Sequence, residues 1–460
     1  MNPESSISPE ALAAATGIAY AHAATPDAPA NMAAAEVEEA GAVFDEDTVM
    51  QPRLLPGTHR YEYIPWGMDD RLPYDILRMV GIDEVMSQNK LFNVLTNYGQ
   101  GLQLVDRTTG KPTDDPDIRE WLLRNAPHQF QLEQATDMKH FYFAVCVITL
   151  SRDGRRITHL RHREACYCRF QKADGHGRIA HVFYGNFRHG RVTEDSVEVL
   201  PLLDFYDPLG DLRRCMGLEA YPDGTRRSKP MAYKYAILTR FPTPGLQYYP
   251  IPYWASIFRG DWYDIKRMIG KGKKALMRNH AVVKYHVELH REYFQRIIMQ
   301  ERITDPQKQR ERISQEKQRI TDFITGAENS GKVWFSSFMT TPDGREQHDV
   351  VITPVNTAKA GGEWSEDIQE ASNMTCYGDN IHPNLVGATP GKSQSNNSGS
   401  DKRELFTMKQ ALEKAWHDIQ MTPWHLVLHY NGWADRLRPE IPMLMLTTLD
   451  EHKDAKEFKV

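Results

Sequence analysis

The sequence predicts an α+β fold preceded by an acidic tail, and three observations lead to this prediction. Stretches with apolar residues at helical intervals flank a central region of short β-like runs, from Phe141 to about Phe241. Hydrophobic residues make up 40% and charged residues 25% of the 460 positions, which is enough to bury a sizeable core. The first 50 residues differ in composition from everything that follows.

Composition also excludes several classes of protein. No apolar run approaches the roughly 18 to 20 residues of a membrane-spanning helix, and no basic patch followed by an apolar stretch suggests a secretory signal. Five cysteines are few for a disulfide scaffold and favour a reducing compartment. These features predict a soluble intracellular protein.

Residues 1–50 hold 15 alanines and nine acidic residues but no lysine or arginine. Such a segment has too little apolar bulk to offset the chain entropy lost on folding. We therefore predict a disordered, alanine-rich acidic tail over residues 1–55. The other 410 residues carry 56 basic and 52 acidic side chains. That balance is too close to neutral to indicate a nucleic-acid binder from charge alone.

Order is expected to begin near Tyr61. Apolar spacing is helical from Tyr74 to Leu95 and again over residues 117–140, and Leu102–Val105 reads as a short strand. Further β-like runs, separated by Gly and Asp turns, predict an antiparallel sheet: Phe143–Leu150, Arg156–Leu160, Ala180–Phe187, Val197–Leu203 and Ala232–Leu238.

An amphipathic helix is predicted after Pro252, because apolar residues repeat there at helical intervals. These residues are Trp254, Ile257, Phe258, Ile265, Met268 and Ile269. The later part of the helix holds six basic residues and no acidic one: Lys266, Arg267, Lys271, Lys273, Lys274 and Arg278. This basic face is either simply solvated, or it contacts nucleic-acid phosphates or the acidic groups of a partner.

The next region alternates between strands and helices. Val282–Leu289 reads as a strand, and a strongly charged helix, interrupted near Pro306, covers about residues 290–325. Gly331–Phe335 and Val350–Thr353 are strand-like, and an amphipathic helix follows from Glu363 to Gly378.

Residues 382–401 form the most distinctive loop, because they are rich in Gly, Ser and Asn. Asp401 and Glu404 resemble a capping box at the start of another helix, which runs to Pro423. Its apolar residues lie on one side: Leu405, Leu412, Ala415, Trp416 and Ile419.

Within that loop, Gly387-Ala-Thr-Pro-Gly391-Lys392-Ser393 invites comparison with a phosphate-binding P-loop. Such a loop needs four residues between its glycines, whereas three stand here, and about eight residues separate Lys392 from the next helix. A solvent-facing loop is therefore the favoured interpretation.

A zinc site is a second alternative. Cys166 and Cys168 lie one residue apart, with His159, His162 and His181 nearby, but no second cysteine pair exists. A Cys-x-Cys pair on a strand would place both thiols on one face, and buried strand cysteines are the preferred interpretation. We predict no metal and no cofactor.

No catalytic signature is present: the sequence lacks a Gly-x-Ser-x-Gly elbow, a His-Glu-x-x-His helix and a dinucleotide fingerprint. The expectation is a structural protein without enzymatic activity.

The order of elements resembles that of the portal proteins of tailed bacteriophages and related prophages, over roughly residues 61–430. Tyr63-Ile-Pro-Trp-Gly-Met-Asp-Asp-Arg-Leu-Pro73 and Tyr98-Gly-Gln-Gly-Leu102 are similar to the start of the family's wing domain. Pro250–Asn279 resembles its stem helix, Val282–Phe335 its clip, and Ile381–Gly387 with the Ser/Asn run its tunnel loop.

The resemblance implies a division of the chain into a wing (residues 56–250), a stem helix (251–281), a clip (282–355) and a returning stem helix (356–381). A tunnel loop (382–401), a long wing helix (402–435) and a short C-terminal tail (436–460) follow. The sequence departs from the family beyond about Asp435, where too little chain remains for the helical crown that many portals carry.

The resemblance further implies a twelve-subunit ring at a capsid vertex, through which double-stranded DNA enters and leaves. Such a ring docks the packaging terminase, head–tail connector proteins and capsid or scaffold proteins, first in the host cytoplasm and later in the virion. Lys392 and Lys402 are the candidate DNA-facing residues of the tunnel loop. A near-neutral body suits a conduit, because each phosphate contact would add affinity and oppose sliding.

Two other functions stay open on the sequence alone. The Gly391-Lys392-Ser393 segment would serve an ATP-binding packaging motor, and the basic run from Lys266 to Arg278 would serve a monomeric DNA-binding or adaptor protein.

Overall fold

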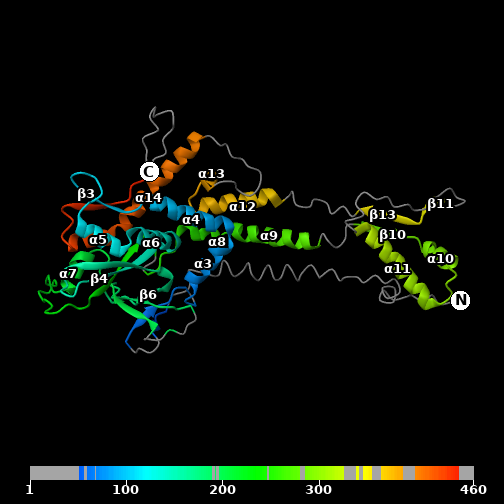
Figure 1. Cartoon of the computed structure of the whole chain (residues 1–460). Coiled ribbons are helices and arrows are strands. Elements are labelled where there is room, and N and C mark those ends of the chain that lie inside the picture. Colours follow the sequence, from blue (N-terminus) through cyan, green and yellow to red (C-terminus); the bar gives the residue numbers. More distant parts are fainter. Residues whose placement is uncertain are drawn as a thin grey trace. The chain divides into compact units, whose positions relative to one another are not determined.

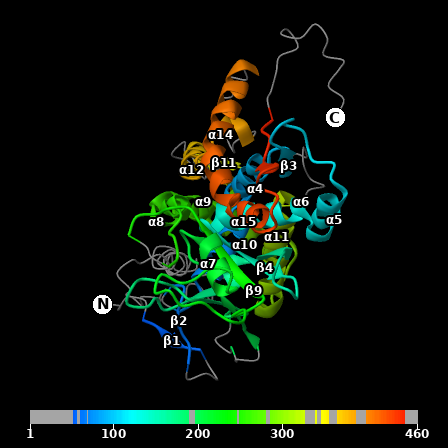
Figure 2. The same ribbon diagram turned by 90° about the vertical axis from the view of Figure 1, so that its left-hand side faces the viewer.

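A computed structural model describes residues 51–55, 60–67, 69–188, 192, 196–245, 248–279, 285–325, 338–340, 346–354, 364–386 and 399–444 (Figures 1 and 2). The chain divides into two compact units. The larger unit comprises Glu36–Arg267 and Trp364–Val460, and the smaller comprises Met1–Ala35 and Met268–Glu363. Helices and sheets both contribute to the larger unit, so the fold is α+β, as predicted.

The sheets of the larger unit are antiparallel. A five-stranded sheet has the order β1-β2-β6-β7-β8, a three-stranded sheet has the order β5-β4-β9, and β14 pairs with β3. The strands are β1 Arg53–Leu54, β2 Glu62–Ile64, β3 Gln103–Asp106, β4 Phe143–Leu150, β5 Ile157–Arg163, β6 Cys168–Gln171, β7 His181–Tyr184, β8 Glu198–Pro201, β9 Lys234–Arg240 and β14 Leu437–Glu440.

β4 is the central strand of the three-stranded sheet and separates two hydrophobic cores. Phe143, Val145 and Val147 face the core that the five-stranded sheet also lines. Cys146 and Ile148 face the second core, which the helices on the other side complete. Burial on both faces explains why this segment is a continuous apolar run instead of an alternating one.

Helices of the larger unit cover these sheets (Figure 1). They are α3 Leu72–Ile82, α4 Glu84–Tyr98, α5 Pro116–Asn125, α6 Pro127–Phe141, α7 Pro208–Cys215, α8 Ser256–Arg259, α12 Trp364–Gly378, α13 Pro383–Val386, α14 Gly399–Gln420 and α15 Thr422–Tyr430, with short 3₁₀ turns η1 Ala165–Tyr167 and η3 Tyr253–Ala255. α9, Asp261–Asn279, contains the boundary between the two units.

Several predicted helices are divided. The Tyr74–Leu95 stretch breaks at Asp83, whose carboxylate accepts a hydrogen bond from the Met86 N–H and caps α4. The 117–140 stretch breaks at Ala126, which has φ 42° in the left-handed region. The helix after Pro252 breaks at Gly260, and the 402–435 wing helix breaks near Met421, because Pro423 lies in the first turn of α15.

Both predicted tails proved too long. Arg53 and Leu54 form β1 against β2, so the N-terminal tail cannot extend to residue 55; Leu55 is fully buried. Residues 437–440 form β14 against β3, so the C-terminal tail cannot begin at residue 436. In both cases the hydrogen-bond partners come from another strand, so the sequence of the tail alone does not reveal them. Residues 1–50 and 445–460 lie outside the described part of the chain.

The smaller unit contains β10 Tyr285–Leu289 paired antiparallel with β13 Val350–Pro354, and β11 Phe338–Thr340 paired with β12 Glu346–His348. Its helices are α10 Arg291–Gln300 and α11 Pro306–Thr325, separated near Pro306 as predicted. Arg312 donates to Glu301 at 2.9 Å and to the buried Glu316 at 3.0 Å, and so ties the two helices together. The predicted strand Gly331–Phe335 lies outside the described residues.

The turn-rich stretch before α3 is held by a buried ion pair. The Asp70 carboxylate accepts from the Trp66 N–H at 2.8 Å and from the Arg169 guanidinium, although Asp70 has φ 62°. Arg169 is fully buried and also donates to the carbonyls of Cys166 and Cys168. The Trp66 ring stacks on Tyr249 with centroids 4.7 Å apart. This polar centre fixes α3 to the five-stranded sheet.

No helix among the described residues is long and apolar enough to span a membrane.

Asp70→Asn should lower the free energy of unfolding by about 3 to 5 kcal/mol, because it leaves the Arg169 charge buried without its partner. Asn tolerates the left-handed backbone at this position, so the substitution tests the charge. The control is Lys172→Ala, which removes an ion pair to Glu62 on the same sheet, where both side chains are about half exposed. Urea unfolding at fixed protein concentration should show a loss below about 1 kcal/mol for the control. Equal losses in the two variants would contradict the prediction.

Candidate functional site: the buried ion pairs at the ends of the 382–401 segment

The structure places the ends of the 382–401 segment. α13, Pro383–Val386, begins it, and α14 starts at Gly399. Lys402 is exposed in the first turn of α14, whereas Lys392 lies outside the described residues, as does the Gly387–Ser393 motif.

The first end is anchored just after α12 by a buried ion pair. Lys90 of α4 donates its Nζ proton to the Asp379 carboxylate at 2.6 Å, and both side chains are at most 3% exposed. Asn93, one turn later on α4, donates to the Asp379 carbonyl at 3.2 Å. The end of α12 is thus fixed to the middle of α4.

A helix cap strengthens the same end. Asn380 has φ 56°, and the Ile381 N–H donates to the Cys376 carbonyl at 2.9 Å, which closes the last turn of α12. Lys409 of α14 donates to the Asn380 carbonyl at 3.2 Å. A lysine at this position also interacts favourably with the negative end of the helix dipole. Lys409 thus joins the end of α12 to α14.

The helix that follows the segment, α14, is anchored at its middle by Glu413. Its carboxylate accepts from the Lys139 ammonium of α6 at 2.6 Å and from the Asn97 amide of α4 at 2.9 Å. One turn later, the His417 ring contacts the Asn97 carbonyl through Nε2 at 2.7 Å. Because a carbonyl only accepts, Nε2 carries the proton. Glu413 therefore connects three helices.

Two tryptophans cover the lysine ammonium groups. Lys90 Nζ lies 3.8 Å from the centroid of Trp254, and Lys139 Nζ lies 3.9 Å from that of Trp416. The Trp254 indole N–H also donates to the Lys139 carbonyl at 3.1 Å. Each buried cation thus has a carboxylate and an aromatic face as partners, and both offset part of the cost of removing it from water.

Burial dominates the protonation of these groups. Desolvation lowers the pKa of Lys90 and of Lys139 to about 8, although Asp379 and Glu413 oppose the shift. Burial likewise lowers the pKa of Lys409 and of His417, and raises the pKa of Asp379 against the effect of Lys90. At neutral pH both lysines therefore stay charged and paired, while His417 is neutral.

These buried ion pairs hold helices in place. Lys90 pairs with Asp379 and Lys139 pairs with Glu413, and the side chains of these two ion pairs are at most 6% exposed. The network fixes the end of α12 and the middle of α14, the helices before and after the 382–401 segment, to α4 and α6. We refer to Lys90, Lys139, Asp379, Lys409 and Glu413, with Asn97, as the anchor network.

The predicted basic face of the stem helix is wrong at Lys266. That side chain is 12% exposed and forms an ion pair with Asp83, so it stabilises the junction of α3, α4 and α9. Arg267 lies over the Tyr263 ring at 5.6 Å. Lys271 and Lys274 are exposed and Lys273 is half-buried, whereas the Arg278 side chain lies outside the described set. The basic surface that remains on α9 is smaller than the sequence suggests.

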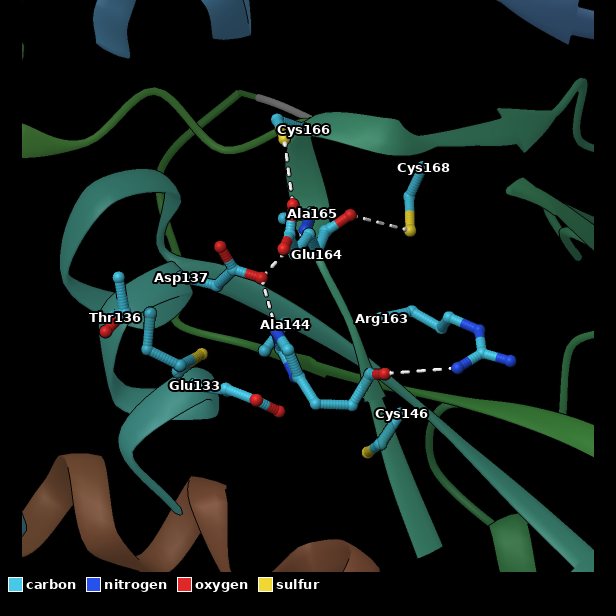
Figure 3. Close-up of polar contacts among 12 residues, drawn as sticks. Glu133, Thr136, Asp137, Ala144, Cys146, Arg163, Glu164, Ala165, Cys166 and Cys168 are labelled. Carbon is cyan, nitrogen blue, oxygen red and sulfur yellow. Dashed lines mark hydrogen bonds and ion pairs between the residues drawn. The ribbon is translucent and has the colours of Figure 1, made fainter. Parts of the chain in front are cut away.

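The cysteine and histidine cluster has a structural role. His162 contacts Asp137 at 2.6 Å, and the Ala165 N–H donates to the same carboxylate at 2.7 Å. Figure 3 shows the contact between Ala165 and Asp137, together with Cys166 and Cys168, whose thiols point to Glu164. Cys166 lies in the turn η1 and only Cys168 begins a strand, so the two do not share one strand face.

Metal binding by these thiols is disfavoured chemically, because burial raises the pKa of Cys166 to about 12 and that of Cys168 well above its usual value. Among the residues that the structure describes, no group of three His, Cys, Asp or Glu side chains is arranged to hold a metal ion.

Sequence reasoning missed every member of the anchor network, although one signal was present. Asn89, Asn93 and Asn97 recur every four residues on α4 and form a polar stripe at helical spacing. All three are buried. A polar stripe is usually assigned to solvent, and only partners from α12 and α14 show that this one faces inward.

Glu413→Gln should lower the free energy of unfolding by about 3 to 5 kcal/mol, because the buried Lys139 charge loses its counter-charge. Lys414→Ala is the matched control, since it removes an exposed pair with Asp418 on the same helix. Urea unfolding should show a loss below about 1 kcal/mol for that control. If Glu413→Gln were as stable as the control, the network would not anchor α14.

The sequence matches no protein-family model and no curated protein. Solved structures nevertheless resemble it over most of its length. A chain in the virion of a native gene transfer agent particle aligns with a TM-score of 0.52 at 11% identity, over 84% of this chain and 86% of that one.

Two chains from necks of the same type of particle are also similar. One, from an empty particle computed with C6 symmetry, aligns with a TM-score of 0.52 at 13% identity over 87% of this chain and 88% of the other. The second, from a native particle computed with C12 symmetry, aligns with a TM-score of 0.51 at 12% identity over 89% of both chains. At these identities the likeness establishes a shared fold.

Proposed function

We propose that this chain is the portal subunit of a phage-like particle. In this proposal, copies of the chain close into a ring at the capsid vertex and form the conduit for double-stranded DNA during packaging and ejection. The observation that carries the proposal is the shared fold, over 84–89% of the chain, with chains of gene transfer agent virions and necks. The order of elements in the sequence supports it independently.

The number of subunits proposed is twelve. One of the similar neck chains belongs to a particle computed with C12 symmetry and another to one computed with C6 symmetry, and a twelve-membered ring is compatible with both. Head-to-tail contacts close into such a ring when the rotation between neighbours is one twelfth of a turn.

The proposed partners are DNA, the terminase, head–tail connector proteins and capsid or scaffold proteins, with assembly in the host cytoplasm and residence in the virion. DNA would be contacted without sequence preference, through Lys392 and Lys402, and the proposal assigns no catalytic activity. The anchor network is consistent with this role, because it fixes the helices before and after the 382–401 segment to the larger unit.

Simple measurements distinguish the portal function from the two alternative functions, an ATP-binding packaging motor and a monomeric DNA-binding or adaptor protein. An ATP-binding motor would hydrolyse nucleotide, which an assay on the purified protein detects. A monomeric DNA-binding protein would show a single subunit in solution. Neither has support from the described structure, and Lys266 is unavailable to DNA because it is paired with Asp83.

The purified chain should form closed rings with a central hole. Negative-stain images with mass photometry would show this, with a mass close to twelve times the 52.9 kDa of one chain. A protein that stayed monomeric at all concentrations and salt conditions would overturn the proposed function.

Lys392→Ala combined with Lys402→Ala should leave ring assembly unchanged and reduce the DNA packaged or retained by particles. Each lysine removed deletes one salt-dependent phosphate contact per subunit, repeated around the ring. Lys414→Ala, another exposed lysine on α14, is the control. The measurement is the DNA content per particle at two salt concentrations. Equal DNA content in the double variant and its parent would contradict the assignment.

A further inference from the structure

α14 buries polar side chains and exposes several apolar ones, although Trp416 stacks on Phe241 of its own chain. Every α14 residue that is more than nine-tenths buried is polar: Lys409, Gln410, Glu413, His417 and Gln420. Met408 is 65% and Leu412 is 56% exposed, and Leu405 and Ile419 are only half-buried. A helix that packs on its own chain normally buries its apolar side and exposes its polar side.

Four apolar residues of α14, two exposed and two half-buried, lie on one side of the helix. Leu405, Met408, Leu412 and Ile419 follow one another at intervals of three, four and seven residues, which places them on one side of the helix. In both Figures 1 and 2, α14 extends beyond the sheets of the larger unit. We call these four residues the α14 stripe.

The helix cannot rotate to bury the α14 stripe within its own unit. A rotation of about a quarter turn or more would be needed, given 3.6 residues per turn. It would withdraw Glu413 from Lys139 and Asn97, and His417 from the Asn97 carbonyl. It would leave the Lys139 charge buried without its counter-charge, which opposes such a rotation.

We propose that the α14 stripe is an interface between neighbouring copies of this chain, and this inference rests on the ring of the proposed function. Each copy would place the stripe against a different face of the next, as head-to-tail ring contacts require. The chain itself carries further exposed apolar surface on the adjacent helix α4, where Leu91 is 49% and Leu95 is 54% exposed.

Charge argues against DNA as the occupant of this surface. The α14 charges outside the anchor network are three acidic and three basic residues: Asp401, Glu404, Asp418, Lys402, Arg403 and Lys414. Their balance offers no net attraction to phosphates, and a duplex gains little from apolar contacts along its backbone. A second copy carries both apolar surface and charges of both signs.

The test begins with Leu412→Glu in the full chain. The added charge would be buried without a partner at the interface, so mass photometry should show that the ring is lost and that monomers remain. Ala411→Glu is the matched control, because it adds the same charge at the neighbouring exposed position, outside the stripe, and should keep the ring. Circular dichroism should show that both variants stay folded.

A labelling measurement distinguishes an interface from a folding defect. All five native cysteines are buried, so a single introduced thiol gives a clean signal. Met408→Cys should react with a maleimide about tenfold more slowly in the ring than in the Leu412→Glu monomer, because an interface core excludes water. Ala411→Cys should react equally fast in both.

Each remaining outcome overturns the inference. Ring formation by Leu412→Glu would contradict the interface, and so would rapid labelling of Met408→Cys in an intact ring. Either result would leave the proposed portal function unaffected. Protection of Met408→Cys already in the folded monomer would show that another segment of the same chain, such as residues 445–460, covers the stripe. A wild-type chain that is only monomeric would reject the proposed function and the interface with it.

Discussion

The organisation of the larger unit depends most on the contacts that the Glu413 carboxylate makes with Lys139 and Asn97. Glu413 lies on α14, and the groups that donate to it come from α4 and α6, more than 270 residues earlier in the chain. A buried carboxylate is stable only with good geometry and satisfied lone pairs. Lys139 and Asn97 supply both. The position of α14 therefore follows from the positions of α4 and α6, which the central strand β4 and its two cores fix in turn.

The contacts of Glu413 also explain why α14 exposes apolar side chains. Holding α14 by its polar face satisfies the buried charges but leaves Met408 and Leu412 exposed. A chain that worked as a monomer would gain stability by the opposite arrangement. In the proposed ring, burial by a neighbouring copy would remove this conflict, since the polar face would serve folding and the apolar face assembly.

Sequence patterns predicted local structure well and distant pairing poorly. Phe143–Leu150 was predicted with the bounds of β4, because a strand buried on both faces is a continuous apolar run. β6, Cys168–Gln171, was missed since Arg169 interrupts its apolar pattern, and that arginine is buried only because Asp70 neutralises it. The apolar side of α14 was identified correctly, but its buried side was not, because charged residues are assigned to solvent unless their partners are known. Asn89, Asn93 and Asn97 indicated a polar contact without indicating which helix would make it.

The buried pairs also bear on how the protein would treat DNA. Lys90, Lys139, Lys409, Arg169 and Lys266 all have acidic partners within the fold, so none is available to a phosphate. The basic surface open to any anionic partner is therefore smaller than a count of lysines and arginines suggests. A conduit benefits from this, because each added phosphate contact strengthens binding and slows the release that movement requires. In the proposed conduit, the charges that stabilise the fold would be separate from those that contact DNA, so a change in salt would weaken the DNA contacts and leave the buried pairs largely intact.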